Sequence, residues 1–216
     1  GLDGSADLAG IEDVFSKLKL SVMPNQVIII KSTVPVGTNK RMFDLINSKS
    51  NRKLNVVSNP EFLREGSAIE DFMKPDRVVI GIRNEFEKKV MAEIYKPLYL
   101  REYPIIYTDP ESAEIIKYAS NSFLATKISF INEVAAFCEM VGGDVKEVSK
   151  GIGMDGRIGK KFLHAGPGYG GSCFPKDTAA FSYMGREVGV PQTIVEAVIK
   201  ANSCLLYTSP SPRDAT

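Results

Sequence analysis

The first half of the chain alternates short apolar runs, rich in β-branched residues, with stretches of helical periodicity. Three of these apolar runs are typical of strands: Gln26–Lys31, Leu54–Ser58 and Arg77–Ile82. Lys40–Asn47 and Phe86–Tyr95 repeat apolar residues at the spacing of a helix. This alternation predicts a parallel α/β sheet.

The second half has a different period. A fourth strand is expected at Tyr103–Tyr107, and Thr108–Glu111 then reads as a helix start, with a capping residue, an early proline and an acid. Ser112–Val141 contains no glycine or proline, and its apolar residues recur at helical spacing. One helix of roughly 45 Å is expected there.

These elements predict a domain plan. Residues 1–109 are expected to form the C-terminal part of a Rossmann-like parallel sheet, and residues 110–202 an all-helical central domain built on the long helix. No G-x-G-x-x-G turn precedes the first strand, so the strands that usually open such a domain are expected to be missing. Residues 203–216, rich in Ser, Pro and Asp, do not continue an apolar face and are expected to be foreign or disordered.

Composition excludes several classes of protein. Lys and Arg (27) nearly balance Asp and Glu (26), and no basic stripe is interleaved with aromatics, so nucleic acid is not an expected partner. The apolar runs are far shorter than the roughly 20 residues of a membrane span, and no leader pattern is present, which predicts a soluble, cytoplasmic protein. A single histidine, His164, without a G-x-S-x-G motif argues against a serine hydrolase.

The strongest chemical signal is the segment Gly166–Asp177, in which a glycine loop delivers Cys173 to the start of a helix. Helical N–H groups and the nearby Lys176 favour a thiolate there, whereas a small residue packed at a helix start is the alternative. Cys138 shares an apolar helix face and is expected in the core, and Cys204 is expected to be an incidental surface thiol. The three cysteines predict neither a disulfide framework nor a metal site.

Two further patterns carry polar residues. Four residues form a polar stripe along the long helix: Glu114, Lys117, Asn121 and Asn132. Taken alone, such a stripe favours a solvent-exposed face, although Lys117 and Asn121, one turn apart, could bind a substrate oxygen together.

The ends of two predicted strands are also polar, at Lys31–Pro35 and Ser58–Gly66. Ligands bind at strand ends in open parallel sheets. In the second motif Glu61 and Glu65 are either a base near the thiol or ordinary surface acids. Ser67 is expected to cap the helix that follows, with Glu70 completing a capping box.

Taken together, these motifs resemble the UDP-glucose/GDP-mannose dehydrogenase family over roughly residues 1 to 202. The segments that carry the resemblance are Lys31–Pro35, Asn59–Asp71, Lys74–Gly81, Lys117–Asn121, Gly153–Gly159 and Gly170–Asp177. In two of these segments, Lys74–Gly81 and Cys173–Asp177, the residues resemble the family members that act on UDP-glucose more than those that act on GDP-mannose or N-acetylhexosamines. The resemblance implies an NAD-dependent, four-electron oxidation of UDP-glucose to UDP-glucuronate through a cysteine thiohemiacetal and thioester.

The resemblance also implies a role for each matching residue. Cys173 would be the nucleophile, Lys117 would stabilise an oxyanion beside Asn121, Asp177 and Thr33 would hold a water or assist proton transfer, and Glu61 would be the base for hydrolysis. The pocket for the sugar nucleotide would use Phe62, Leu63, Lys117, Asn121, Arg157, Phe162, Gly170 and Phe174. The residues on the cofactor side would be Ser32, Thr33, Glu65 and Lys176.

In the family the long helix forms a dimer interface, so a homodimer through residues 110–141 is implied, with Arg157 reaching into the partner's site. The glycine-rich pyrophosphate turn of the family would precede residue 1, and its C-terminal domain would follow where residues 203–216 stand. The chain by itself is therefore expected to be inactive. Two alternatives stay open: a family member acting on GDP-mannose or a UDP-N-acetylhexosamine, and a non-catalytic dimerisation module.

Overall fold

The computed structural model describes residues 4–21, 23, 25–48, 54–64, 66–99 and 103–208. They form two compact units: a sheet unit, Ala6–Lys117, and a helical unit, which combines Tyr118–Thr216 with Gly1–Ser5. The elements, in chain order, are α1 (Ala9–Ser21), β1 (Val27–Ile30), α2 (Thr38–Asn47), β2 (Asn55–Ser58), α3 (Ala68–Met73), β3 (Val78–Gly81), α4 (Glu85–Ile94), α5 (Lys96–Tyr99), β4 (Ile105–Thr108), α6 (Pro110–Val141), α7 (Val145–Gly153), α8 (Phe174–Glu187) and α9 (Thr193–Thr208).

The sheet has the order β1-β2-β3-β4 and mixed strand directions. β1 pairs with β2, and β3 with β4, in parallel, but β2 and β3 pair antiparallel where Ser58 lies opposite Gly81. The expectation of an all-parallel sheet is therefore wrong at this pair. A parallel crossover needs a helix packed on the sheet, and α3, which links β2 to β3, has no buried residue.

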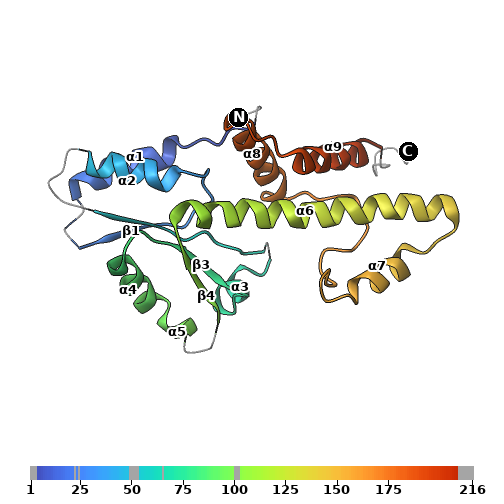
Figure 1. Cartoon of the computed structure of the whole chain (residues 1–216), viewed down its shortest axis with the longest axis horizontal. Coiled ribbons are helices and arrows are strands. Elements are labelled where there is room, and N and C mark those ends of the chain that lie inside the picture. Colours follow the sequence, from blue (N-terminus) through green and yellow to red (C-terminus); the bar gives the residue numbers. More distant parts are fainter. Residues whose placement is uncertain are drawn as a thin grey trace. The chain divides into compact units, whose positions relative to one another are not determined.

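Two hydrophobic layers enclose the sheet because consecutive strand residues point to opposite faces. Val56 belongs to the cluster with Met42 and Ile46 of α2, and the neighbouring Val57 to the cluster with Met91 of α4. Figure 1 shows α1 and α2 on one side of the sheet and α4 and α5 on the other. The predicted α/β architecture is confirmed.

Helix α6 begins where the sequence indicated. Asp109 caps it by accepting a hydrogen bond from the Ser112 N–H at 2.7 Å, and Pro110 is its first residue. The start of the helix lies so close to β3 that a Cβ atom on Gly81 would come within 2.6 Å of Pro110 Cα. Only glycine fits there without displacing backbone. In contrast, Ser67 precedes α3 as expected, but its side chain makes no capping hydrogen bond.

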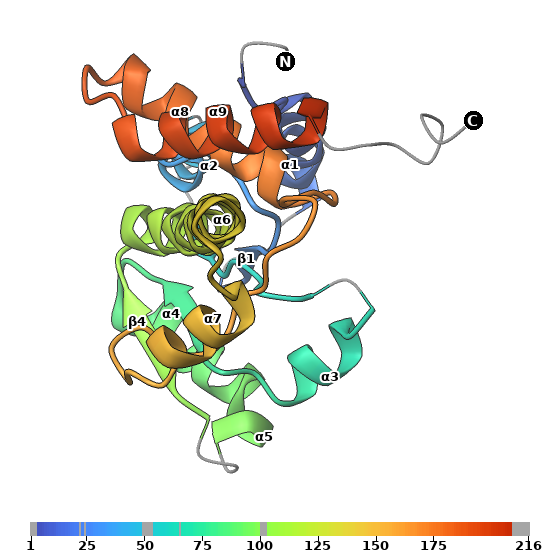
Figure 2. The same cartoon turned by 90° about the vertical axis from the view of Figure 1, so that its right-hand side faces the viewer.

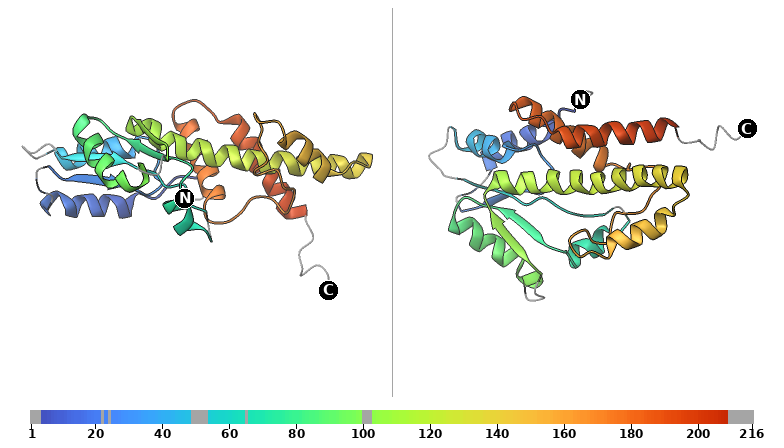
Figure 3. Two further views of the ribbon diagram at one scale, coloured as in Figure 1. Left: turned by 90° about the horizontal axis from the view of Figure 1, so that it is seen from below. Right: turned by 45° about the vertical axis from the view of Figure 1, so that its right-hand side comes forward.

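The helical unit contains the rest of α6 with α7, α8 and α9 (Figures 2 and 3). α8 and α9 pack side by side. A small hydrophobic core contains Ala125 of α6, Val198 of α9, and Tyr169 from the loop before α8. Cys138 is buried on α6, and Cys204 is exposed on α9, as predicted. Across the described ranges, no helix is long and apolar enough to span a bilayer.

Two boundaries differ from the expected domain plan. The division between the units falls between Lys117 and Tyr118 rather than after residue 109, because the first two turns of α6 pack in the sheet unit. Helix α9 continues to Thr208, so residues 203–208 are helical, contrary to the irregular tail expected from residue 203. The remainder of that predicted tail, residues 209–216, lies outside the described residues.

Candidate active site

Cys173 is the N-cap residue of α8, at the end of the glycine loop. Its thiol is half-buried, and its sulfur lies 3.6 Å from the Ser172 hydroxyl. The first N–H groups of a helix have no helical partner and carry partial positive charge, so the sulfur lies in an electropositive position. The predicted delivery of the cysteine to a helix N-terminus is confirmed.

A buried carboxylate lies one turn further along α8. Asp177 is only 1% exposed. Its Oδ2 accepts a hydrogen bond of 2.6 Å from the Asn121 amide of α6, and its Oδ1 one of 2.6 Å from the Lys176 ammonium. Both oxygens are thus held in charge-assisted or amide hydrogen bonds, which offset the cost of burying the charge. The Lys176 ammonium, expected beside the thiol, is bonded to Asp177.

The glycine loop that carries Cys173 is anchored at two points. The Gly166 N–H donates to Asn132 Oδ1 of α6 at 2.8 Å. Tyr169 exchanges two backbone hydrogen bonds with the Asn202 amide of α9, at 2.8 and 3.0 Å. A side chain at Gly168 would meet that same amide, with its Cβ 2.5 Å from Asn202 Oδ1. The loop is therefore positioned by side chains of two helices, and glycine is required at the close approach.

Aromatic rings pack against the first residue of α8. Phe162 and Tyr169 each contact the Phe174 ring edge-on, with centroids 6.1 and 6.2 Å apart. Phe162 is half-buried and has a φ of +64°, a left-handed conformation that is uncommon for a bulky residue. Gly170 lies exposed in the same loop. Phe162, Gly170 and Phe174, predicted to line the sugar pocket, thus belong to one loop region.

Arg157 is the member of the predicted set that lies apart from this region. Its side chain is 90% exposed, and its guanidinium donates three hydrogen bonds to the Asp155 carboxylate, of 2.6, 3.0 and 3.2 Å. Because its partner is two residues away in the same loop, the pair is local.

In the sheet unit, Ser32, Thr33 and Lys117 come together. They line one small pocket at the carboxyl end of β1, along with Ile30, Val34, Ser58, Pro60 and Glu114. Ser32 and Thr33 follow β1, Ser58 ends β2, and Lys117 lies in the second turn of α6. Ligands bind at this edge of an open α/β sheet.

The Phe62 ring lies against two cations. Lys117 Nζ is 5.1 Å from its centroid and the Arg77 guanidinium carbon is 3.7 Å from it. Lys117 itself is 6% exposed, so its charge is held in a largely dry environment. Leu63, the next residue, is half-buried.

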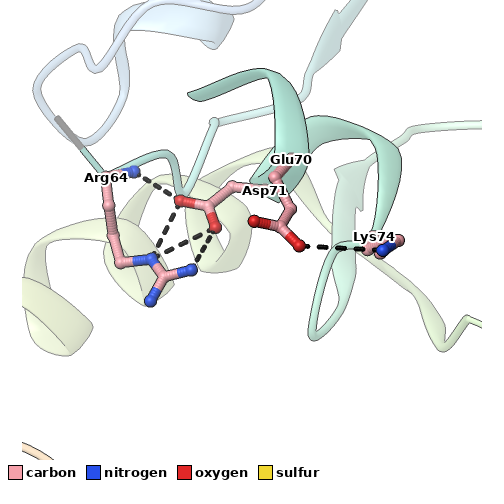
Figure 4. Close-up of polar contacts among 4 residues, drawn as sticks. All are labelled: Arg64, Glu70, Asp71 and Lys74. Carbon is pink, nitrogen blue, oxygen red and sulfur yellow. Dashed lines mark hydrogen bonds and ion pairs between the residues drawn. The ribbon is translucent and has the colours of Figure 1, made fainter. Parts of the chain in front are cut away.

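The segment that carries Glu61 is fixed to α3. Arg64 donates to Asp71 from its backbone N–H at 2.7 Å and binds the carboxylate through its guanidinium, as Figure 4 shows. Glu61 is exposed, and the field of its carboxylate acts on Lys31. The two nearby arginines contact other groups: Arg64 binds Asp71, and the Arg77 guanidinium lies over the Phe62 ring. Glu65 lies outside the described residues.

The polar stripe of α6 is buried. Glu114, Lys117, Asn121 and Asn132 are all 3–8% exposed, so the solvent-exposed interpretation is wrong. The stripe is polar because it meets polar groups: Asn121 binds Asp177, Asn132 binds the glycine loop, and Glu114 accepts backbone N–H bonds. Burial raises the pKa of Glu114 to about 7, although its hydrogen bonds from Asn39 and Gly37 act in the opposite direction.

Sequence reasoning missed a second polar cluster. Lys31 Nζ lies 3.3 Å from both Asn59 Oδ1 and the Tyr95 hydroxyl, and that hydroxyl donates to Asn59 at 2.5 Å. Burial lowers the pKa of Lys31, although Glu61 opposes the shift, and burial raises the pKa of Tyr95. Lys31 and Asn59 lie in the two polar strand ends that the sequence indicated, but Tyr95, which ends the helix expected at Phe86–Tyr95, carries no local signal of this contact.

Two sets of predicted residues are therefore gathered, one in each unit. The helical unit brings together Cys173, Asp177, Asn121, Lys176 and the aromatic loop, and the sheet unit gathers Ser32, Thr33, Lys117 and Phe62. Lys117 and Asn121 are one turn apart on α6.

Sequence comparisons match both units to one family. Residues 2–99 match the NAD binding domain of the UDP-glucose/GDP-mannose dehydrogenase family, and residues 111–204 match its central domain. UDP-glucose 6-dehydrogenase of Rhizobium meliloti is 49% identical over 203 residues, which are 93% of this chain and 46% of that enzyme. The enzyme TuaD of Bacillus subtilis, also a UDP-glucose 6-dehydrogenase, is 49% identical over 92% of this chain and 43% of its own length.

Solved structures agree with the sequence relatives. A UDP-glucose dehydrogenase from Pyrobaculum islandicum superposes with a TM-score of 0.87 at 42% identity, covering 94% of this chain and 48% of that one. GDP-mannose dehydrogenase from Pseudomonas aeruginosa gives a TM-score of 0.65 at 32% identity, covering 93% and 48%. The chain thus spans about half the length of the relatives it matches.

Proposed function

Because this chain belongs to the UDP-glucose/GDP-mannose dehydrogenase family, we propose that it forms part of an enzyme that oxidises UDP-glucose to UDP-glucuronate with NAD. Oxidation of a primary alcohol to a carboxylate removes four electrons as two hydrides and consumes one water. Two NAD would be consumed for each sugar, and each would accept one hydride. The other requirements, which are binding, proton transfer and covalent capture, fall to the protein.

The polar residues at the carboxyl end of β1 are suited to bind NAD. Ser32 and Thr33 supply hydroxyl groups and Lys117 an ammonium group, all at the carboxyl end of β1, where dinucleotides bind in open sheets. Hydroxyl and ammonium groups match the polar atoms of a nicotinamide riboside. Ser32 and Thr33 would therefore hold the cofactor side, with Glu65 and Lys176 assigned there by the family resemblance alone.

The observation that carries the proposal is Cys173 as N-cap of α8, one turn before the buried Asp177 that Asn121 binds. The Cys173 thiolate would add to the carbon of the aldehyde formed by the first hydride transfer, giving a thiohemiacetal. Loss of the second hydride converts it to a thioester, and water then breaks the C–S bond and returns the thiolate. The covalent bond keeps the reactive aldehyde from escaping.

Other residues would stabilise the charges that develop during the reaction, transfer protons or bind the sugar nucleotide. The Lys117 ammonium would stabilise the oxyanion of the sugar oxygen, with the Asn121 amide one turn away. Asp177, held by two donors, and Thr33 would orient a water or assist proton transfer. Glu61, whose side chain is exposed, would be the base for thioester hydrolysis. Phe62, Leu63, Phe162, Gly170 and Phe174 would line the pocket for the sugar nucleotide.

Thiol reactivity in the chain itself tests the role of Cys173. Iodoacetamide at pH 6–7 is expected to alkylate Cys173 about tenfold faster than Cys204, because the N–H groups at the start of α8 make its surroundings electropositive, while buried Cys138 stays protected. Peptide mass spectrometry over a time course measures the three rates. In urea the three rates should converge, which is the control. If Cys204 reacts as fast as Cys173 in the folded chain, the non-catalytic dimerisation module becomes the better explanation.

We also propose that the enzyme is a homodimer through α6. Phe123, Phe130 and Phe137 are spaced by seven residues on this helix and are each more than half exposed. An apolar stripe of this kind is typical of a helix–helix interface. Arg157 would then reach the partner's site.

Sedimentation equilibrium tests the dimer. At tens of micromolar the chain is expected to be dimeric, and Phe130→Glu is expected to make it monomeric because a charge cannot be buried unpaired. Phe86→Glu, which changes an exposed aromatic residue on α4, is the matched control and should leave the dimer intact. A monomeric wild-type chain contradicts the proposal.

UDP-glucose is favoured over the alternative sugars by degree of similarity. The relatives named for UDP-glucose are 42–49% identical, against 32% for the GDP-mannose enzyme. A cytoplasmic location belongs to the same proposal and is supported by the sequence, which holds only three cysteines, too few and too scattered for a disulfide framework.

A further inference from the structure

A carboxylate from α6 caps the first turn of α2. Gly37, the N-cap residue of α2, has no side chain to cap the helix. Glu114 Oε2 accepts the Gly37 N–H at 2.7 Å, and Oε1 accepts the Asn39 N–H at 2.9 Å. Two of the N–H groups that a helix start leaves without helical partners are thus satisfied by a residue 75–77 positions away.

The cap belongs to a buried polar network. The Ser58 hydroxyl of β2 donates to Glu114 Oε1 at 3.4 Å, and the Asn39 amide donates to that hydroxyl at 2.9 Å. Arg83 in turn donates to the Asn39 side chain. Because Glu114 is 3% exposed, breaking the cap would leave buried N–H groups without acceptors.

The cap also fixes the segment that carries two proposed site residues. The chain between β1 and α2 contains Ser32 and Thr33, and it ends at the N–H groups that Glu114 holds. Lys117 follows Glu114 by one turn on the same helix, and all four residues line one pocket. Nothing in the proposed chemistry uses Glu114 itself, which touches backbone.

We propose that Glu114 is a positioning residue that ties the 32–37 loop to α6, so that Thr33 and Lys117 meet in one pocket. This role rests on the proposed function in one respect only, the assignment of those two residues to the reaction. The tie itself is a property of the folded chain and is measured without substrate or NAD.

The charge of Glu114 gives the tie a pH dependence. Its pKa is raised by burial to about 7 from the usual 4.5. A carboxyl group with a raised pKa binds its proton more tightly in the closed, buried state than in an opened one. The closed state is therefore most stable below about pH 4.5 and is weakened as pH rises through about 7. Of the charged groups around it, Glu111 on the same helix adds to the shift, Lys117 lines the same pocket, and Arg83 contacts Asn39.

Amide hydrogen exchange of the full chain tests the proposal. After correction for intrinsic rates, protection of the Gly37 and Asn39 amides is expected to fall by about tenfold or more between pH 5 and pH 8. Glu114→Ala removes both acceptor oxygens, so both cap bonds are lost at any pH. The Gly37 and Asn39 amides should then exchange about tenfold or more faster than in wild type at pH 5, with protection that no longer depends on pH.

Glu133→Ala, which changes an exposed residue further along α6, is the matched control and should leave protection within about twofold of wild type. Equal protection in the two alanine variants would overturn the proposal. If Glu114→Ala does not fold, the wild-type chain decides the matter: Gly37 and Asn39 amides that exchange at their intrinsic rates at pH 5 would overturn it. Neither result depends on whether UDP-glucose is a substrate.

Discussion

Serine in place of Cys173 is expected to lower the rate of NADH formation from UDP-glucose by at least about a thousandfold. A serine hydroxyl is a far weaker nucleophile than a cysteine thiol at neutral pH, so the aldehyde carbon is not captured. The thiohemiacetal from which the second hydride is transferred does not form. Because the chain spans about half the length of its relatives, the rate is measured in a chimera in which it replaces the matching segment of a UDP-glucose 6-dehydrogenase.

The control for this substitution is Cys204→Ser, which changes an exposed thiol of the same unit. It should leave the rate within about twofold of the unsubstituted chimera, since surface changes away from a site usually have small effects. Full activity of the Cys173→Ser chimera would remove the thiol from the reaction.

Methionine in place of Lys117 is expected to lower kcat by about 10²–10³-fold, the usual cost of removing one preorganised donor from an oxyanion. The change keeps the apolar stem of the side chain against Phe62 and removes only the charge, which lies 5.1 Å from that ring. KM for the sugar should change less than kcat, because the interaction is strongest when the oxyanion develops. Steady-state kinetics of the same chimera separate the two parameters.

Lys127→Met is the matched control on the same helix. The Lys127 ammonium binds the Ile158 carbonyl at 3.0 Å in an exposed position, so its loss should leave kcat nearly unchanged. Equal losses in both variants would indicate that α6 tolerates neither substitution, and Lys117 would lose its assigned role.

Much of the fold follows from local sequence signals. The run without glycine or proline, and the Asp109-Pro110 start, predicted α6 closely, since helix length and capping are properties of neighbouring residues. The direction of β3 did not follow, because a run of β-branched residues is the same in either direction. What decides it is whether the connecting helix packs on the sheet, and α3 does not.

The sequence predicted those parts of the candidate site whose position follows from a local motif. A glycine loop that enters a helix at Cys173 is visible in the sequence, and so is a polar residue after a strand. The stripe on α6 was misjudged because a polar face is normally solvated. Asn121 and Glu114 are buried only because Asp177 and the Gly37 N–H, 56 and 77 positions away, supply their partners. Contacts of that range are not encoded in local periodicity.

The most direct test of the central claim is the yield of NADH per sugar in the chimera, measured with limiting UDP-glucose and separately with limiting GDP-mannose. We expect two NADH for each UDP-glucose consumed and none from GDP-mannose, because the route through the thioester removes two hydrides before the product leaves. A yield of one NADH with release of free aldehyde, or oxidation of GDP-mannose in place of UDP-glucose, would contradict it.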